Sequence, residues 1–186
     1  KFCILLCSHN PLPLYLKAQL YSIRKSTSSD LYLFDFGSSD ESLSEQIRLA
    51  KRFNAKYTRI NHAHGPRKSF LQALNDDRLL KYDYIFLVDQ DDVWKKEKFY
   101  VVSQICKVIT PDLLTHDVEV FKPNVRLGSF SSFKKKHITR ELQKDMLLTS
   151  NPVIGHTFVI SKKLLMDFNG ISERISFPMH DWELLF

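Results

Sequence analysis

The pattern of hydrophobic and polar positions along residues 1–110 predicts strands that are each followed by a helix. Four short apolar segments, at residues 2–7, 31–36, 55–60 and 82–88, are typical of buried strands. Each of them is followed by apolar residues at helical spacing. Four strand–helix units in succession predict an α/β fold, in which a mostly parallel central sheet carries helices on both faces.

The pattern is weaker over residues 111–186. The predicted elements are a strand at 113–121, a polar loop at 122–137, a helix at 139–149, a strand at 152–161 and a short helix at 162–168. Earlier in the chain, Ser38 and Glu41 fit a capping box, and the helix after Pro66 is expected to run to about Leu80. No repeat or boundary divides the chain, so we expect one domain over residues 1–186.

Composition adds constraints on class and location. The 186 residues are 44% hydrophobic and 26% charged, as in ordinary globular proteins, and no apolar run approaches the roughly 18 residues of a membrane span. The three cysteines, Cys3, Cys7 and Cys106, are odd in number, and two of them lie in one apolar run, which predicts reduced buried thiols and a cytoplasmic protein. The chain starts and stops abruptly, so we expect it to be part of a longer protein.

The net charge of +6 favours an anionic partner, such as a phosphorylated substrate or the inner face of a membrane. The triple lysine at 134–136 is the densest positive cluster, and it fits either a solvated loop or such a surface. Nucleic acid is a weaker candidate, because the chain has no basic motif interleaved with aromatic residues.

Three carboxylates, Asp89, Asp91 and Asp92, directly follow an apolar strand segment. Like charges at this spacing repel one another, and each resists leaving water, so a bound cation is expected. Hard cations such as Mg²⁺ and Mn²⁺ take oxygen ligands of this kind. The stretch is too compact for a calcium loop of the EF-hand type.

Two other polar clusters follow predicted strands: Ser8-His9-Asn10 after the first, and residues 35–40 after the second. In open α/β sheets ligands bind beyond the carboxyl ends of the strands, so these clusters and the three carboxylates are expected to meet. Arg67 and Lys68, at the start of the third helix, would attract phosphate there, although a solvated helix start is an equally good interpretation.

Several phosphate-binding classes lack their motif in this chain. It contains neither Gly-x-x-x-x-Gly-Lys nor Gly-x-Gly-x-x-Gly, which disfavours P-loop and dinucleotide-binding proteins. A nucleotidyltransferase would want a glycine-rich basic loop after the first strand, but "SHNPLPLYLK" contains no glycine.

The segment "DQDDVW", residues 89–94, resembles the acidic signature of family 2 glycosyltransferases of the GT-A fold, in their rhamnosyltransferase-like branch. Further segments resemble that branch in the same order along residues 2–185. They are "CSHNPLPLYLKAQLYSI" (7–23), "DFGSSDES" (35–42), "GPRKSFLQAL" (65–74), "NPVIGHTFVISKKLL" (151–165) and "HDWELL" (180–185). A lone acidic pair would be weak evidence, whereas six ordered matches are specific.

The resemblance implies an inverting glycosyltransferase that uses Mg²⁺ or Mn²⁺ and a dTDP- or UDP-sugar, with rhamnose among the candidate sugars. Residues 1–110 would form the nucleotide-sugar-binding half, and residues 111–186 the half that carries the acceptor site and the catalytic base. The acceptor would be a surface glycan or a lipid-linked saccharide, at the inner face of the membrane.

The resemblance also implies a role for individual residues. Ser8 and Asn10 would line the nucleobase pocket, Asp35 and Asp40 would lie near the base or ribose, and Arg67 would face the base or the diphosphate. Asp89 and Asp91 would reach the ribose and the metal, with Asp91 and Asp92 as metal ligands. Asp181 would be the catalytic base, with His180 and Trp182 beside it on the acceptor side.

The chain departs from the family pattern at four positions. Phe36 replaces an aspartate, His9 a tyrosine, His156 a smaller residue and Glu183 a tryptophan. Because of Phe36 and Glu183, a non-catalytic nucleotide-sugar-binding or scaffold domain of a glycan-assembly protein is the alternative function. Structural roles are also open for single residues: Asp35 in a turn, Trp94 as a packing anchor, and His116 with Asp117 in hydrogen bonding.

Overall fold

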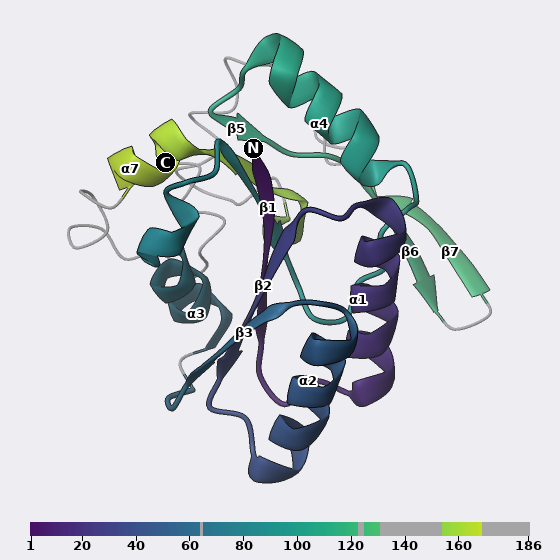
Figure 1. Cartoon of the computed structure of the whole chain (residues 1–186). Helices are drawn as coiled ribbons and strands as arrows, with labels where there is room; N and C mark the ends of the chain where they lie inside the picture. Colours follow the sequence, from purple (N-terminus) through teal and green to yellow (C-terminus); the bar gives the residue numbers. More distant parts are fainter. Residues whose placement is uncertain (64, 123–124, 131–153, 169–186) are drawn as a thin grey trace, which may run out of the picture.

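The structure is a computed structural model that describes residues 1–63, 65–122, 125–130 and 154–168 (Figure 1). A six-stranded sheet forms its centre, in the order β3-β2-β1-β4-β8-β5. Neighbouring strands from β3 to β4 are parallel, whereas β8 runs antiparallel to both β4 and β5. The strands are β1 (Phe2–Ser8), β2 (Asp30–Phe36), β3 (Lys56–Ile60), β4 (Tyr84–Val88), β5 (Leu113–Leu114) and β8 (Val159–Ser161). The α/β prediction is therefore confirmed.

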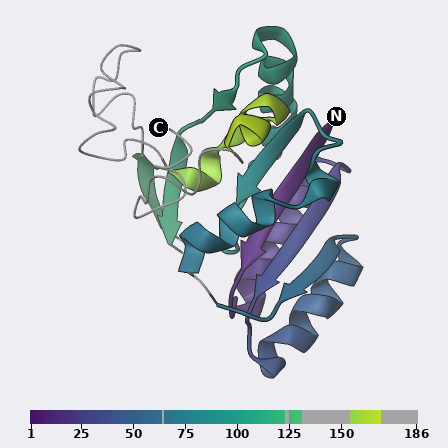
Figure 2. The same ribbon diagram turned by 90° about the vertical axis from the view of Figure 1, so that its left-hand side faces the viewer.

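Helices cover both faces of the sheet (Figures 1 and 2). Side chains alternate along β1, so Ile4 and Leu6 pack on one face and Cys3 and Leu5 on the other. The Ile4 face is covered by α1 (Pro13–Ser26), α2 (Asp40–Arg52) and α4 (Lys98–Ile109), and the Cys3 face by α3 (Gly65–Leu74) and α7 (Lys162–Phe168). Both faces of β1 and β4 are buried, which explains why these strands are continuously apolar.

The second half of the chain differs from its prediction. The strand expected at 113–121 is split: β5 ends at Leu114, and β6 (Val118–Lys122) pairs with β7 (Val125–Phe130) in a separate two-stranded sheet. The expected polar loop at 122–137 was therefore wrong over β7. At the break, the Thr115 hydroxyl lies 2.5 Å from that of Thr157, a contact between residues that are 42 apart in the chain.

Of the strand expected at 152–161, the structure describes residues 154–161, and among these only Val159–Ser161 form a strand, which the 3-10 turn η2 (Gly155–Thr157) precedes. Likewise, α3 ends at Leu74, before the expected Leu80, and is followed by the 3-10 turn η1 (Asp77–Leu79). The Asp76 side chain caps η1 by accepting the backbone N–H of Arg78 at 2.9 Å. The helix predicted at 139–149 lies outside the described residues.

The turn between β2 and α2 is built differently from the predicted capping box. Ser39, not Ser38, caps α2, and its hydroxyl accepts the N–H of Ser42 at 3.4 Å. Gly37 has φ +63°, and a Cβ there would lie 2.7 Å from the backbone nitrogen of Ala63. Only glycine fits this turn without moving the neighbouring loop.

Cys3, Cys7 and Cys106 are free and buried, as predicted. Burial raises the pKa of the Cys7 thiol well above its ordinary value, so this thiol is a packing group and not a nucleophile. None of the helices in the described ranges combines the length and hydrophobicity that a membrane crossing requires.

Candidate active site

The loops at the carboxyl ends of β1, β2 and β4 are joined by hydrogen bonds. The backbone N–H of His9 donates to Oε1 of Gln90 at 2.9 Å, which links the loops after β1 and β4. The backbone N–H of Asn10 donates to Ser38 Oγ at 2.8 Å, and Asn10 Oδ1 accepts the N–H of Ser39 at 2.9 Å. The expected meeting of the three polar clusters is therefore found at this edge of the sheet.

A buried hydrogen-bond network supports these loops from below. Asp35 has no exposed surface, and its carboxylate accepts hydrogen bonds from Ser38, from Tyr57 at 2.9 Å and from Gln46 at 3.3 Å. The hydroxyl of Ser8 donates to Oε1 of Gln46 at 2.7 Å. Because Asp35 is enclosed, it acts on the loops through Ser38, which in turn holds the backbone of Asn10.

Two of the predicted donor-binding residues, Asp40 and Arg67, lie further from these loops. The Asp40 side chain is 96% exposed in the first turn of α2, where it lies 3.5 Å from Arg59. Arg67 is half-buried in the first turn of α3. Its neighbours Pro66 and Ser69 line a pocket at the sheet edge.

This pocket, called the β1 pocket here, has a volume of about 400 Å³. It lies between the end of β1, the loop after β4, the start of α3 and η2. Its lining includes three predicted donor residues, Ser8, Asp89 and Asp91, together with His9, Phe36 and Gln90. The volume lies within the ~300–1,000 Å³ that is usual for ligand pockets.

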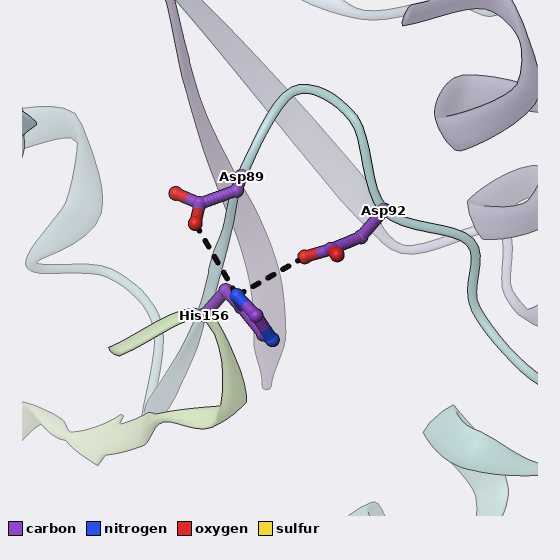
Figure 3. A group of neighbouring side chains, drawn as sticks. All are labelled: Asp89, Asp92 and His156. Carbon is purple, nitrogen blue, oxygen red and sulfur yellow. Dashed lines mark hydrogen bonds and ion pairs between the residues drawn. The ribbon is translucent and has the colours of Figure 1, made fainter. Parts of the chain in front are cut away.

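Asp89, Asp92 and His156 form a side-chain cluster at one end of the β1 pocket (Figure 3). Nδ1 of His156 lies 3.3 Å from Oδ2 of Asp89 and 3.3 Å from Oδ2 of Asp92. One potential ligand atom from each residue lies within 4.8 Å of the others, a spacing that fits a shared metal ion. We call this group the Asp-Asp-His cluster.

The pairing of β4 with β8 creates the cluster. Phe86 of β4 lies opposite Val159 of β8, and the N–H of Leu87 donates to the carbonyl oxygen of Phe158 at 2.9 Å. This antiparallel register places η2, which carries His156, beside the carboxyl end of β4, where Asp89 begins the acidic loop.

No protein-family model matches the chain. Among curated proteins, the dTDP-rhamnosyl transferase RfbG of Shigella flexneri is 27% identical over 186 aligned residues, which cover 91% of this chain and 60% of that protein. Among solved structures, residues 1–349 of S. aureus TarS match 100% of this chain and 54% of theirs, at 22% identity and a TM-score of 0.68.

A third similar protein is the mannosyltransferase PcManGT from Pyrobaculum calidifontis, solved with GDP-Man and Mn²⁺. It is 16% identical over 89% of this chain and 46% of its own, with a TM-score of 0.62. The chain has the GT-A fold. The resemblance to rhamnosyltransferase-like glycosyltransferases is confirmed, and the chain spans about half to three fifths of the length of these relatives.

Electrostatics makes the Asp-Asp-His cluster of this GT-A domain a good host for a cation. Burial raises the pKa of Asp92, the charge of His156 opposes this, and Asp89 and Asp91 raise it further. For His156, burial alone would lower the pKa, but the hydrogen bond to Asp89 and the charges of Asp92 and Asp89 outweigh it and raise the pKa. The two carboxylates thus favour a positive partner, which a divalent ion would supply.

The structure groups the metal-ligand candidates differently from the sequence analysis. Asp92 belongs to the cluster as expected, but Asp89 and His156 complete it, and Asp91 is an exposed residue that lines the β1 pocket. His156 had been noted only as a departure from the family pattern. Its signal was long-range, because it depends on the pairing of β4 with β8. His180, Asp181 and Trp182 lie outside the described residues.

Proposed function

We propose that the chain is the donor-binding domain of a metal-dependent, inverting glycosyltransferase. The observation that carries this proposal is the Asp-Asp-His cluster, which adjoins a pocket of about 400 Å³ at the carboxyl edge of a GT-A sheet. A nucleoside would enter the β1 pocket and leave its diphosphate beside the cluster. The relatives support this arrangement, since TarS has been solved with UDP-GlcNAc and PcManGT with GDP-Man and Mn²⁺.

Asp89, Asp92 and His156 would hold the divalent ion. When bound, such an ion supplies charge stabilisation to the departing diphosphate. Mg²⁺ takes oxygen ligands almost exclusively, and the imidazole in this set therefore makes Mn²⁺ the better match of the two.

The remaining donor contacts follow the shape of the β1 pocket. Ser8 and Asp91 line it and would contact the nucleoside, with Asp89 shared between ribose and metal. Asn10 and Asp35 would act by fixing the loops, through the hydrogen bonds to Ser38 and Ser39. Asp40 and Arg67 would approach the donor from the rim, at the starts of α2 and α3.

The catalytic base, the sugar and the acceptor rest on the resemblance. Asp181 would take the proton of the acceptor hydroxyl, with His180 and Trp182 on the acceptor side. The similarity to a dTDP-rhamnosyl transferase favours dTDP-rhamnose as donor, with a UDP-sugar as the alternative. A surface glycan or lipid-linked saccharide at the cytoplasmic face of the membrane would be the acceptor.

Calorimetric titration of the full-length protein with dTDP, UDP and GDP tests the proposal, with Mn²⁺, with Mg²⁺ and with EDTA. We expect metal-dependent binding of one nucleotide, weakened at least tenfold by Asp92→Asn. Asp83→Asn is the matched control, because Asp83 precedes β4 at the opposite end of the strand. Equal affinity in Mn²⁺ and EDTA would disprove the metal site, and no binding of any nucleotide would disprove the donor site.

Turnover then separates the two functions that the sequence left open. A glycosyltransferase releases dTDP from dTDP-rhamnose, or UDP from a UDP-sugar, when a saccharide acceptor is added. Binding without release across a panel of acceptors would instead identify a nucleotide-sugar-binding scaffold.

A further inference from the structure

Helix α4, on the outside of the molecule, is apolar on both of its faces (Figure 1). Its inner face packs on the sheet through Val102 and Cys106. Its outer face carries four exposed apolar side chains at helical spacing, Val101, Ile105, Val108 and Ile109. We call these four residues the α4 stripe, of which Val108 is 82% exposed. The helical spacing places Tyr100 and Lys107, also exposed, along one side of the stripe.

Helix α2 covers the same face of the sheet but has an ordinary solvated surface. It contains Asp40, Glu41 and Glu45, and Ile47 is the one large apolar side chain that this fully described helix exposes. Helix α4, in contrast, contains no acidic residue. A helix that is apolar all round is normally covered, and contiguous exposed apolar side chains usually mark a binding surface. The α4 stripe is therefore expected to have an occupant.

The α4 stripe is a fixed surface, because α4 and the residues before it are firmly held from inside. Trp94 packs on Phe86 with ring centroids 5.4 Å apart, and its backbone N–H donates to the Ser22 hydroxyl of α1 at 2.9 Å. The N–H of Phe99 donates to the hydroxyl of Ser26, also in α1, at 3.2 Å. The expected packing role of Trp94 is therefore confirmed, and it helps to set the position of α4.

The charges around the α4 stripe are mostly positive. Residues 95–109 contain four lysines and one glutamate. The Ser26 hydroxyl donates to the carbonyl oxygen of Lys96 at 3.1 Å, which brings the exposed Lys25 of α1 to the amino end of α4. Lys107 lies in the last turn of the helix. Lysines thus flank the stripe at both ends, and an anionic surface complements them.

We infer that the α4 stripe docks on an anionic lipid bilayer, with its apolar side chains at the acyl boundary and the ammonium groups of Lys25, Lys96 and Lys107 at the headgroup phosphates. Interfacial helices combine an apolar face with lysines in this way. Tyr100 beside the stripe belongs to a residue type that is enriched at membrane interfaces. Two copies of the chain that met through α4 would bring their lysines together, which disfavours self-association.

Vesicle flotation of the full-length protein tests this docking surface. The vesicles are phosphatidylcholine alone, or phosphatidylcholine with one third phosphatidylglycerol. We expect at least tenfold stronger binding to the anionic vesicles, and at least a tenfold loss of it in Val108→Asp. Ile47→Asp is the matched control on α2 and should stay within twofold of the wild type. The dTDP affinity should be unchanged in both variants, because neither residue lines the β1 pocket.

The charge contribution is measured with Lys96→Ala combined with Lys107→Ala. Each lysine at an anionic surface strengthens binding roughly fivefold, so we expect the double variant to bind roughly 20-fold more weakly. Lys17→Ala combined with Lys51→Ala is the control, since these exposed lysines lie on α1 and α2, away from the stripe. Raised salt should weaken the wild type more than the double variant. Equal losses in the two double variants would show that only the overall charge attracts the protein, and would overturn the docking surface.

A direct contact is detected with an environment-sensitive fluorophore on Val108→Cys, because Cys3, Cys7 and Cys106 are buried. We expect its emission to shift to the blue when anionic vesicles are added, and no shift for the same label on Ile47→Cys. An unshifted label at residue 108, or a wild type that binds no vesicle, would overturn the inference. A wild-type dimer that Val108→Asp dissociates would assign the stripe to a second copy of the chain instead. Vesicle docking through α4 in a protein that binds no nucleotide would keep this inference and disprove the proposed function.

Discussion

The two pockets beside the Asp-Asp-His cluster are built in opposite ways. Around the β1 pocket, the loops rest on a buried network that centres on Asp35 and reaches Ser8, Ser38 and Gln46. On the other side of the cluster lies a cavity of about 460 Å³ that is lined by Trp94, Val101 and His156, and we call it the α4 pocket. Beside it, the ion pair of Lys95 and Glu119, 2.9 Å long, ties β6 to the loop after β4, and the lysine side chain is 66% exposed. Buried networks rigidify a structure, whereas exposed ion pairs contribute little. The loops around the β1 pocket are therefore fixed, and the β6 wall of the α4 pocket is the more adaptable part.

The largest stability effect should come from Asp35→Ala. This change leaves the hydroxyls of Ser38 and Tyr57 and the amide of Gln46 without their buried acceptor, so we expect roughly 3 kcal/mol less stability. Urea unfolding measures it. Asp40→Ala, five residues later and almost fully exposed, should stay within about 0.5 kcal/mol. Equal losses of stability in the two variants would contradict the interpretation that the buried network fixes the loops around the β1 pocket.

His156→Ala should have the next largest effect, on activity. His156 bridges the two pockets and is the nitrogen ligand of the proposed metal site, so we expect transfer to fall about 100-fold, or about 2.7 kcal/mol of barrier. The Mn²⁺ concentration needed for half-maximal rate should rise in parallel. His62→Ala, in the exposed loop after β3, is the control. A rate loss that is independent of Mn²⁺ concentration would show that His156 does not act through the metal.

The sequence predicted the side of the β1 pocket far better than the side of the α4 pocket, for a physical reason. Continuously apolar strands such as β1 and β4 identify a parallel sheet, and the carboxyl ends of such strands share one edge, so Ser8, Asn10 and Asp89 were expected to meet. These relations depend on local pattern alone. Short local signals also misled: Ser38 fits a capping box in sequence, but the turn at Gly37 directs it to Asp35 and leaves the cap to Ser39.

The side of the α4 pocket depends on contacts between residues that are far apart in the chain. His156 reaches Asp89, 67 residues away, only because β8 pairs with β4. The strand predicted at 113–121 breaks at a contact between Thr115 and Thr157, 42 residues apart. No periodicity in a short window contains either relation. The hydrogen bonding expected of His116 with Asp117, by contrast, is local, and the structure shows it at 2.8 Å.

A smaller effect, on stability, is expected from two single glycine substitutions in the loops around the β1 pocket. Gly37 and Gly65 both have positive φ, of 63° and 75°, but only Gly37 has backbone atoms where a Cβ would lie. We expect Gly65→Ala to cost about 1 kcal/mol through backbone conformation alone. Gly37→Ala should cost about 2 kcal/mol, because the strand-to-helix turn must shift as well. Denaturation curves and the dTDP affinity of both variants check this, and equal costs would mean that the loop at Ala63 yields easily.

The smallest effect, and the sharpest contrast with Asp35, concerns Lys95 and Glu119 at the rim of the α4 pocket. Because the pair is largely exposed, a double-mutant cycle with Lys95→Ala and Glu119→Ala should give a coupling free energy of about 0.2–1 kcal/mol. The coupling should disappear near 1 M salt, where the screening length is roughly 3 Å. The dTDP affinity should be unchanged throughout the cycle. A coupling above about 2 kcal/mol that persists in high salt would show that β6 is held as firmly as the loops around the β1 pocket, and the contrast between the two pockets would then be lost.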